Sequence, residues 1–62
     1  MIYKSEKILD KQYNISSSGI GNWKLQEYIN GCKRSELIMT TEEKNKFTQR
    51  LEDNGWYEYI RS

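Results

Sequence analysis

Proton transfer at neutral pH has few candidate side chains in this sequence, because it contains no histidine. Imidazole is the group most often used for acid and base work near pH 7, and it completes the Ser-His-Asp and Cys-His arrangements and the HExxH helix of metalloproteases. With one cysteine and no histidine, a single chain also cannot assemble a zinc site of the Cys/His kind. The sequence therefore predicts no catalytic, cofactor-binding or metal-binding residues.

Carboxylate, lysine, tyrosine and cysteine chemistry remain, and each has a structural explanation, as the carboxylates and the lone cysteine illustrate. Glu42 and Glu43 are adjacent, so on a helix their side chains point about 100° apart instead of toward one substrate. The same argument applies to Glu52 and Asp53. Cys32 lies beside a predicted tight turn, where we expect a half-buried hydrophobic cysteine and not a nucleophile. We therefore expect that the protein is not an enzyme.

Aromatic side chains are the feature that most favours a binding function. The chain has two tryptophans, five tyrosines and one phenylalanine in 62 residues. A domain of this size removes only about 60% of its unfolded surface from water, so it cannot bury all of them well. Because Trp and Tyr dominate binding hot spots, the sequence predicts a protein interface that includes Trp23, Tyr28, Trp56, Tyr57 and Tyr59. The alternative is that they form the core of a chain that lacks valine and alanine.

Self-association is the simplest use of such an interface. A core this small stabilises a fold by roughly 3 to 5 kcal/mol unless disulfides, a metal or oligomerisation add to it. The first two are not available to one chain of this composition, so we expect a homodimer through Tyr57, Tyr59 or Trp23.

Basic residues offer a second kind of partner. Lys33 and Arg34 lie near the predicted turn and are the possible nucleic-acid contacts, with neighbouring aromatics as stacking surfaces. The net charge, however, is only +1, from ten basic and nine acidic residues, and acidic residues are interleaved with the basic ones. Nucleic-acid binding is therefore disfavoured, although a small nucleic-acid-binding regulator stays open as the alternative function.

The element that best positions these groups is a hairpin over Trp23–Ile38. Asn30-Gly31 lies between two runs of strand length and is the preferred type I′ turn, whose two central residues need positive φ. Leu25 opposite Glu36 is the poor pairing in this register. The favourable cross-strand pairs are Ile29 with Cys32, Glu27 with Arg34, and Trp23 with Ile38.

A helix competes with the hairpin over residues 22–34. Leu25, Tyr28, Ile29 and Cys32 have helical spacing, with Asn22 as a possible cap. A glycine within a helix costs about 1 kcal/mol relative to alanine, so the hairpin is favoured at Gly31.

Upstream, the pattern is less decisive. Tyr13–Ser16 alternates as a short strand does, and Ser16–Asn22 is a loop that joins it to the hairpin, which makes a three-stranded meander plausible. Residues 2–12 fit both a helix and a strand, and the strand is favoured.

Downstream, the signals are stronger. Thr40-Thr-Glu-Glu43 fits a capping box, so a helix is expected over Thr41–Asp53, followed by a left-handed stop at Asn54-Gly55. Trp56–Ile60 is dense in strand-forming residues and alternates between two faces.

Together these elements predict a single α+β domain over residues 1–62. It has a small antiparallel sheet built from a hairpin or meander, one helix and a C-terminal strand. No apolar run suggests a signal peptide or a membrane span, so we expect a cytoplasmic protein without a membrane role. The expected function is that of a small phage or mobile-element protein that binds an unidentified host protein stoichiometrically and inhibits or modulates it, as an anti-defence protein would.

Overall fold

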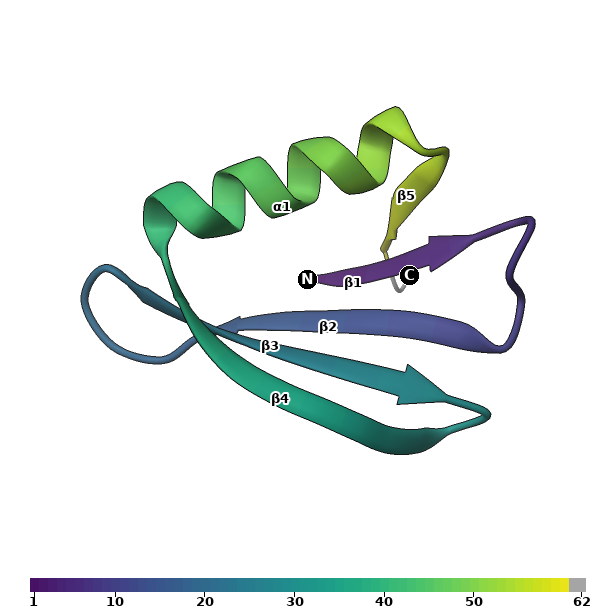
Figure 1. Cartoon of the computed structure of the whole chain (residues 1–62), viewed down its shortest axis with the longest axis horizontal. Coiled ribbons are helices and arrows are strands. Elements are labelled where there is room, and N and C mark those ends of the chain that lie inside the picture. The colour runs from purple at the N-terminus through teal and green to yellow at the C-terminus, as the bar shows by residue number, and fades with distance from the viewer. Residues whose placement is uncertain (61–62) are drawn as a thin grey trace.

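The computed structural model describes residues 1–60 and contains a five-stranded antiparallel sheet with one helix (Figure 1). The strand order is β4-β3-β2-β1-β5, so the helix carries the chain from one edge of the sheet to the other. The predicted α+β fold is confirmed. In chain order the elements are β1 (Ile2–Ser5), β2 (Lys11–Ser17), β3 (Asn22–Ile29), β4 (Cys32–Thr40), α1 (Thr41–Asp53) and β5 (Trp56–Tyr59).

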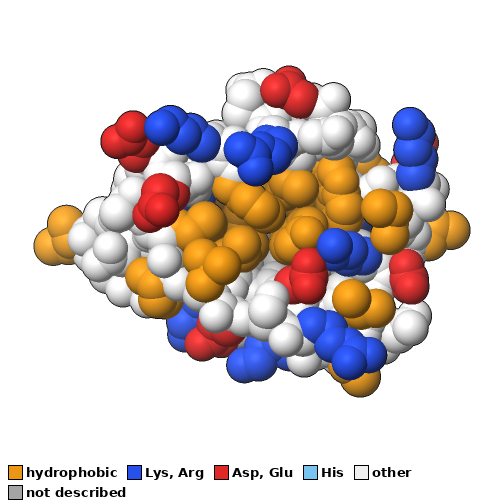
Figure 2. All heavy atoms as spheres, in the orientation of Figure 1, with side chains coloured by type: hydrophobic (Ala, Val, Ile, Leu, Met, Phe, Trp, Pro, Cys, Tyr) orange, Lys and Arg blue, Asp and Glu red, His pale blue; other side chains and the backbone are white. Residues whose placement is uncertain are grey.

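The core lies between α1 and one face of the sheet, which we call the helix side. Because strand side chains alternate between faces, each strand sends every second residue into this core. Figure 2 shows apolar side chains gathered between the helix and the strands. The buried apolar residues are Tyr3, Ile15, Leu25, Met39, Leu51 and Trp56, with Tyr13, Trp23 and Phe47 packed against them.

The hairpin between β3 and β4 is confirmed, and the competing helix is wrong. Asn30 and Gly31 have φ values of 53° and 79°, as a turn with positive φ at both central residues requires. Ile29 lies opposite Cys32 as predicted. Glycine destabilises the interior of a helix, and in the hairpin the backbone N–H and C=O groups of both strands are satisfied by pairing within the sheet.

The predicted register of the hairpin is correct only near the turn. Tyr28 faces Lys33 but Glu27 faces Ser35, so Arg34 is an extra residue in a β-bulge and does not pair with Glu27. From there the register is shifted by one residue. Trp23 consequently lies opposite Met39 and not opposite Ile38.

The bulge corrects the poor pairing that a regular hairpin would contain. Leu25 lies opposite Leu37 and not opposite Glu36. A one-residue shift moves every following side chain to the other face. Leu37 and Met39 therefore lie on the helix side with Leu25, and Glu36 lies on the opposite face.

The N-terminal region forms two strands, so the meander has four strands and not three. The strand favoured for residues 2–12 is interrupted: β1 ends at Ser5, and β2 begins at Lys11. Between them the chain turns, with the Lys7 amide donating to Ser5 Oγ at 3.2 Å and the Lys11 amide donating to the Ile8 carbonyl at 3.4 Å. β2 extends the predicted Tyr13–Ser16 strand at both ends.

The helix has the predicted bounds because its ends are capped as the sequence indicates. The Glu43 amide donates to Thr40 Oγ1 at 3.2 Å, and Glu43 Oε1 accepts from the Thr40 amide at 3.0 Å. Gly55 follows with φ of 88°. Within residues 1–60, α1 is the single helix, and it is neither long nor apolar enough to cross a membrane.

β5 ends at Tyr59, one residue earlier than predicted, and pairs antiparallel with β1. Trp56 lies opposite Ser5 and Tyr57 opposite Lys4. This pairing makes β5 one edge of the sheet and leaves β4 as the other.

Candidate functional site

The face of the sheet opposite α1 is not covered by any element of residues 1–60, and we call it the open face (Figure 1). Residues directly opposite each other on paired strands share a face, so its members follow from the strand registers. They include Ile2, Lys4, Gln12, Asn14, Ser16, Lys24, Gln26, Tyr28, Lys33, Glu36, Ile38, Tyr57 and Tyr59.

Two rows of side chains cross the open face from β5 to β3. The first row contains Tyr57, Lys4, Gln12 and Tyr28, in that order. The second row contains Tyr59, Ile2, Asn14 and Gln26. Each row therefore begins with a tyrosine at the β5 edge and has an amide side chain on β2.

The tyrosines at the edge keep a large part of their surface in water. Tyr57 is 43% exposed and Tyr59 is 42% exposed, whereas Tyr28 is half-buried. Lys4 Nζ lies 4.1 Å from the centroid of the Tyr59 ring, which is a cation–π distance. This contact links the side chain of Tyr59 on β5 to that of Lys4 on β1.

Two shallow hollows share Lys4 and Gln12 as lining residues. One, of about 270 Å³, is completed by Ile2 and Tyr59. The other, of about 420 Å³, lies where the β1–β2 and β3–β4 turns meet, and Tyr28 is part of its wall. The Gln12 side-chain amide donates to Asn14 Oδ1 at 2.9 Å. Each amide side chain has two donor hydrogens and an acceptor oxygen, so this bond leaves donors and acceptors that a partner could use.

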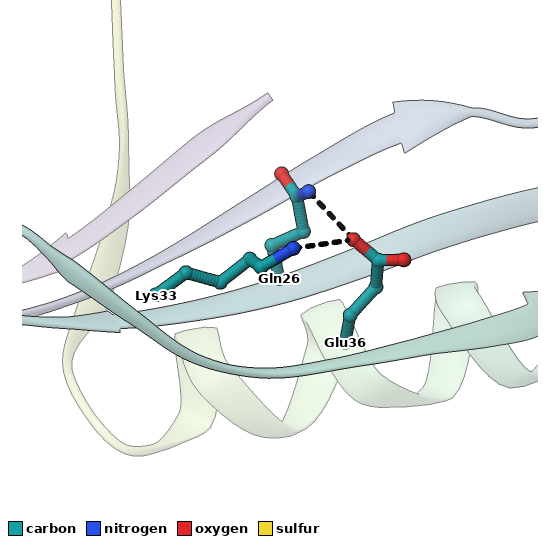
Figure 3. Close-up of polar contacts among 3 residues, drawn as sticks. All are labelled: Gln26, Lys33 and Glu36. Atoms are coloured by element: carbon teal, nitrogen blue, oxygen red, sulfur yellow. Dashed lines mark hydrogen bonds and ion pairs between the residues drawn. The ribbon is translucent and has the colours of Figure 1, made fainter.

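A polar cluster occupies the β3–β4 side of the open face (Figure 3). Glu36 Oε1 accepts a hydrogen bond from Gln26 Nε2 at 2.8 Å and lies 3.3 Å from Lys33 Nζ. The hydrogen bond from Gln26, followed by the bond and charge of Lys33, holds the pKa of Glu36 below its usual range. Lys33 is thus engaged with a carboxylate, while Arg34 lies exposed at the bulge.

The two tryptophans predicted for the interface lie on the helix side, away from the three tyrosines. Trp56 is only 9% exposed and its ring centroid lies 5.1 Å from that of Tyr13, so it is part of the core. Trp23 is partly buried and donates from Nε1 to Thr41 Oγ1 at 3.0 Å. Lys44 Nζ lies 4.5 Å from the Trp23 ring. The five predicted residues therefore do not form one surface.

The groups considered for chemistry are dispersed. Cys32 is exposed and not half-buried as expected, because it begins an edge strand. Glu42 pairs with Lys46 at 3.3 Å, and Glu43 caps the helix. Among residues 1–60, no group of three or more Cys, Asp or Glu side chains is placed to hold a metal ion.

Lys4 and Gln12 are central to the open face and were not singled out from the sequence. Their types carry no distinctive signal, and their position depends on the long-range pairing of β1 with β5. The alternation of residues 2–5 as a strand is the one local signal that could have placed Lys4 on this face.

No protein-family model, curated protein or solved structure significantly matches this chain.

Proposed function

We propose that this protein acts without catalysis, by binding another protein through the open face of its sheet. The observation that supports this most strongly is the presence of Tyr28, Tyr57 and Tyr59 together on a face that no element of residues 1–60 covers. The biological setting we propose is a small phage or mobile-element protein that inhibits or modulates a host protein, such as a defence protein, by stoichiometric binding in the cytoplasm.

The side chains of the open face suit a protein partner. Tyrosine rings supply rigid contact area at a low cost in side-chain entropy, and such anchors often contribute about 2 kcal/mol or more each at the centre of an interface. Gln12, Asn14 and Gln26 add neutral donors and acceptors around the rings.

The charge of the open face indicates the kind of partner surface. Lys4, Lys24 and Lys33 share the face with a single carboxylate, Glu36. Complementary potentials increase association rates and select partners, so we expect the target to present an acidic patch.

The proposal is tested by capture of partners from lysate of the host. Tagged protein is used at about 0.3 M salt, where the Debye length is short and weak charge contacts are screened. Nuclease treatment runs in parallel, and mass spectrometry identifies the retained proteins. One nuclease-resistant protein in a stoichiometric amount is expected.

Two variants make the capture specific to the open face. Tyr28→Thr/Tyr57→Thr/Tyr59→Thr keeps strand-forming residues and should lose the partner, since threonine has high strand propensity but little contact area. The control Asn45→Ala/Gln49→Ala changes the exposed outer side of α1 and should retain it. Equal retention by both variants would contradict a binding role for the open face.

Single-stranded nucleic acid is a second candidate partner, because lysines and tyrosines are adjacent on the open face, as in Lys4 over Tyr59. Fluorescence anisotropy with a labelled oligonucleotide should then show an affinity that falls steeply with salt, and Lys33→Glu/Arg34→Glu should abolish binding. Absence of binding at low salt would remove this candidate.

A further inference from the structure

We propose that a second copy of this chain pairs antiparallel along the free edge of β4, so that the two sheets become continuous. This self-association is separate from target binding, since it uses the edge of the sheet and leaves the tyrosines of the open face exposed. It assigns the expected homodimer to β4 in place of the Tyr57 and Tyr59 surface.

The two edges of the sheet differ in their capacity to pair. β4 has nine residues, eight of which are exposed, whereas β5 has four residues. A long edge strand presents a row of backbone donors and acceptors that can pair with another strand, and proteins blunt such edges by keeping them short or interrupting them. The short length of β5 protects that edge from pairing with another strand, whereas the long β4 has no such protection.

The interruption in β4 is confined to its first part. The bulge at Arg34 and the charge of Lys33 protect the edge beside the turn. From Ser35 to Thr40 the strand is regular, and it carries exposed apolar groups on both faces. Leu37 is 49% exposed on the helix side and Ile38 is 54% exposed on the open face.

An antiparallel register with Ile38 opposite Ile38 of the second copy pairs apolar side chains with apolar side chains. It places Leu37 opposite Met39 of the second copy and Glu36 opposite Thr40. A register centred on Leu37 would instead set Ile38 opposite Glu36. Cross-strand apolar pairs stabilise a sheet, so the register centred on Ile38 is favoured.

Charge supports the same register. β4 begins with Lys33 and Arg34 and runs directly into the acidic first turn of α1, which contains Glu42 and Glu43. Antiparallel pairing brings the start of one strand to the end of the other. Arg34 and Glu42 are each four residues from Ile38 in the sequence, so the basic start of one β4 would lie near the acidic first turn of α1 in the other copy, once on each side of the two-fold axis.

The groove between α1 and β4 would also be covered. Its volume is about 250 Å³ and its apolar floor is formed by Leu37, Met39 and Phe47 (Figure 2). A two-fold axis perpendicular to the sheet keeps both helices on one side, so the grooves of the two copies adjoin. Apolar surface that one copy leaves in water is then buried by the other.

Sedimentation velocity over a range of concentrations tests the proposal. The wild-type chain should form a dimer, and Ile38→Lys should be monomeric, because it sets two lysines opposite each other at the axis. The control Ile20→Lys changes a fully exposed loop residue and should remain dimeric. Circular dichroism confirms that each variant is folded. A monomeric wild-type chain at all concentrations, or an Ile38→Lys dimer of unchanged affinity, would overturn the proposal.

A charge-swap experiment tests the register. Arg34→Glu and Glu42→Arg should each weaken the homodimer by about tenfold in Kd, since each places like charges near each other at both ends of the interface. An equimolar mixture of the two variants should restore the dimer as a heterodimer, in which opposite charges again lie near each other at both ends. If the mixture is no more dimeric than either variant alone, the register centred on Ile38 is wrong.

Discussion

Lys11 on β2 and Glu27 on β3 form an ion pair that links two central strands on the helix side. Lys11 Nζ lies 3.1 Å from Glu27 Oε2, and the two side chains are 29% and 24% exposed. The bond from Lys11 lowers the pKa of Glu27, and bonds to Tyr13 and then Glu27 raise the pKa of Lys11. Both shifts favour the charged forms in the folded state.

The pH dependence of stability follows from these directions. Glu27 has a folded pKa below its unfolded value, so its stabilisation is present above the unfolded pKa and is lost as pH falls through the folded pKa. Lys11 has a folded pKa above its unfolded value, so its stabilisation is complete at pH 7 and is lost only as pH rises through the folded pKa.

Glu27→Gln should therefore lower the free energy of unfolding at pH 7 by about 0.5 to 1 kcal/mol, and this difference should shrink as pH falls through the folded pKa of Glu27, which lies below the ordinary value for a glutamate. Urea unfolding at pH 7 and pH 3 measures it. Glu36→Gln is the exposed control and should have a smaller effect. A difference that is the same at both pH values would show that packing of the side chain, and not its charge, is responsible.

For single residues, the sequence identifies the residue type but not the neighbours that the residue has in the fold. Tyr28, Tyr57 and Tyr59 could be selected as surface aromatics because a small domain cannot bury all its rings. Trp56 could not be separated from them, because its burial depends on α1 lying over that face of β5.

The start of α1 depends on one hydroxyl group. Thr40→Ala removes the acceptor for the Glu43 amide and should cost about 1 kcal/mol of stability. Thr40→Ser keeps the hydroxyl and should cost less. Thermal unfolding followed by circular dichroism measures both variants, and equal losses would show that the methyl group of Thr40, and not the cap, is what matters.

The bulge in β4 sets which residues of that strand enter the core. Deletion of Arg34 would restore a regular hairpin and turn Leu37 and Met39 to the open face. We expect a loss of at least about 2 kcal/mol, the lower range for removing a buried methionine side chain. Arg34→Ala keeps the residue count and should retain most of the stability. Chemical denaturation distinguishes them, and a deletion variant as stable as Arg34→Ala would contradict the proposed role of the bulge.

Elements defined by local signals were predictable, and those defined by distant contacts were not. The turn at Asn30-Gly31 and the caps of α1 act within a few residues, so the sequence places them correctly. The bulge prevents Leu25 from lying opposite Glu36, and this unfavourable pairing can be recognised only when the two strands are aligned. The pairing of β5 with β1 joins the two ends of the described chain and has no local signal.

For the whole molecule, one helix on one face of a sheet leaves the other face and the long β4 edge for intermolecular contacts. The two proposals use these surfaces separately: the open face binds a target, and the β4 edge binds a second copy. A dimer would present two open faces on the same side of a continuous sheet. This arrangement would favour a target with two binding sites, through an increased effective concentration.

The tyrosines of the open face should be the groups that bind the protein target. Titration calorimetry measures the affinity of the captured target for Tyr28→Thr/Tyr57→Thr/Tyr59→Thr and for the wild-type chain, and circular dichroism checks that the variant is folded. We predict at least a hundredfold loss in Kd, as expected when three aromatic anchors are truncated. Unchanged affinity in the folded variant would contradict the claim and place the binding surface elsewhere on the molecule.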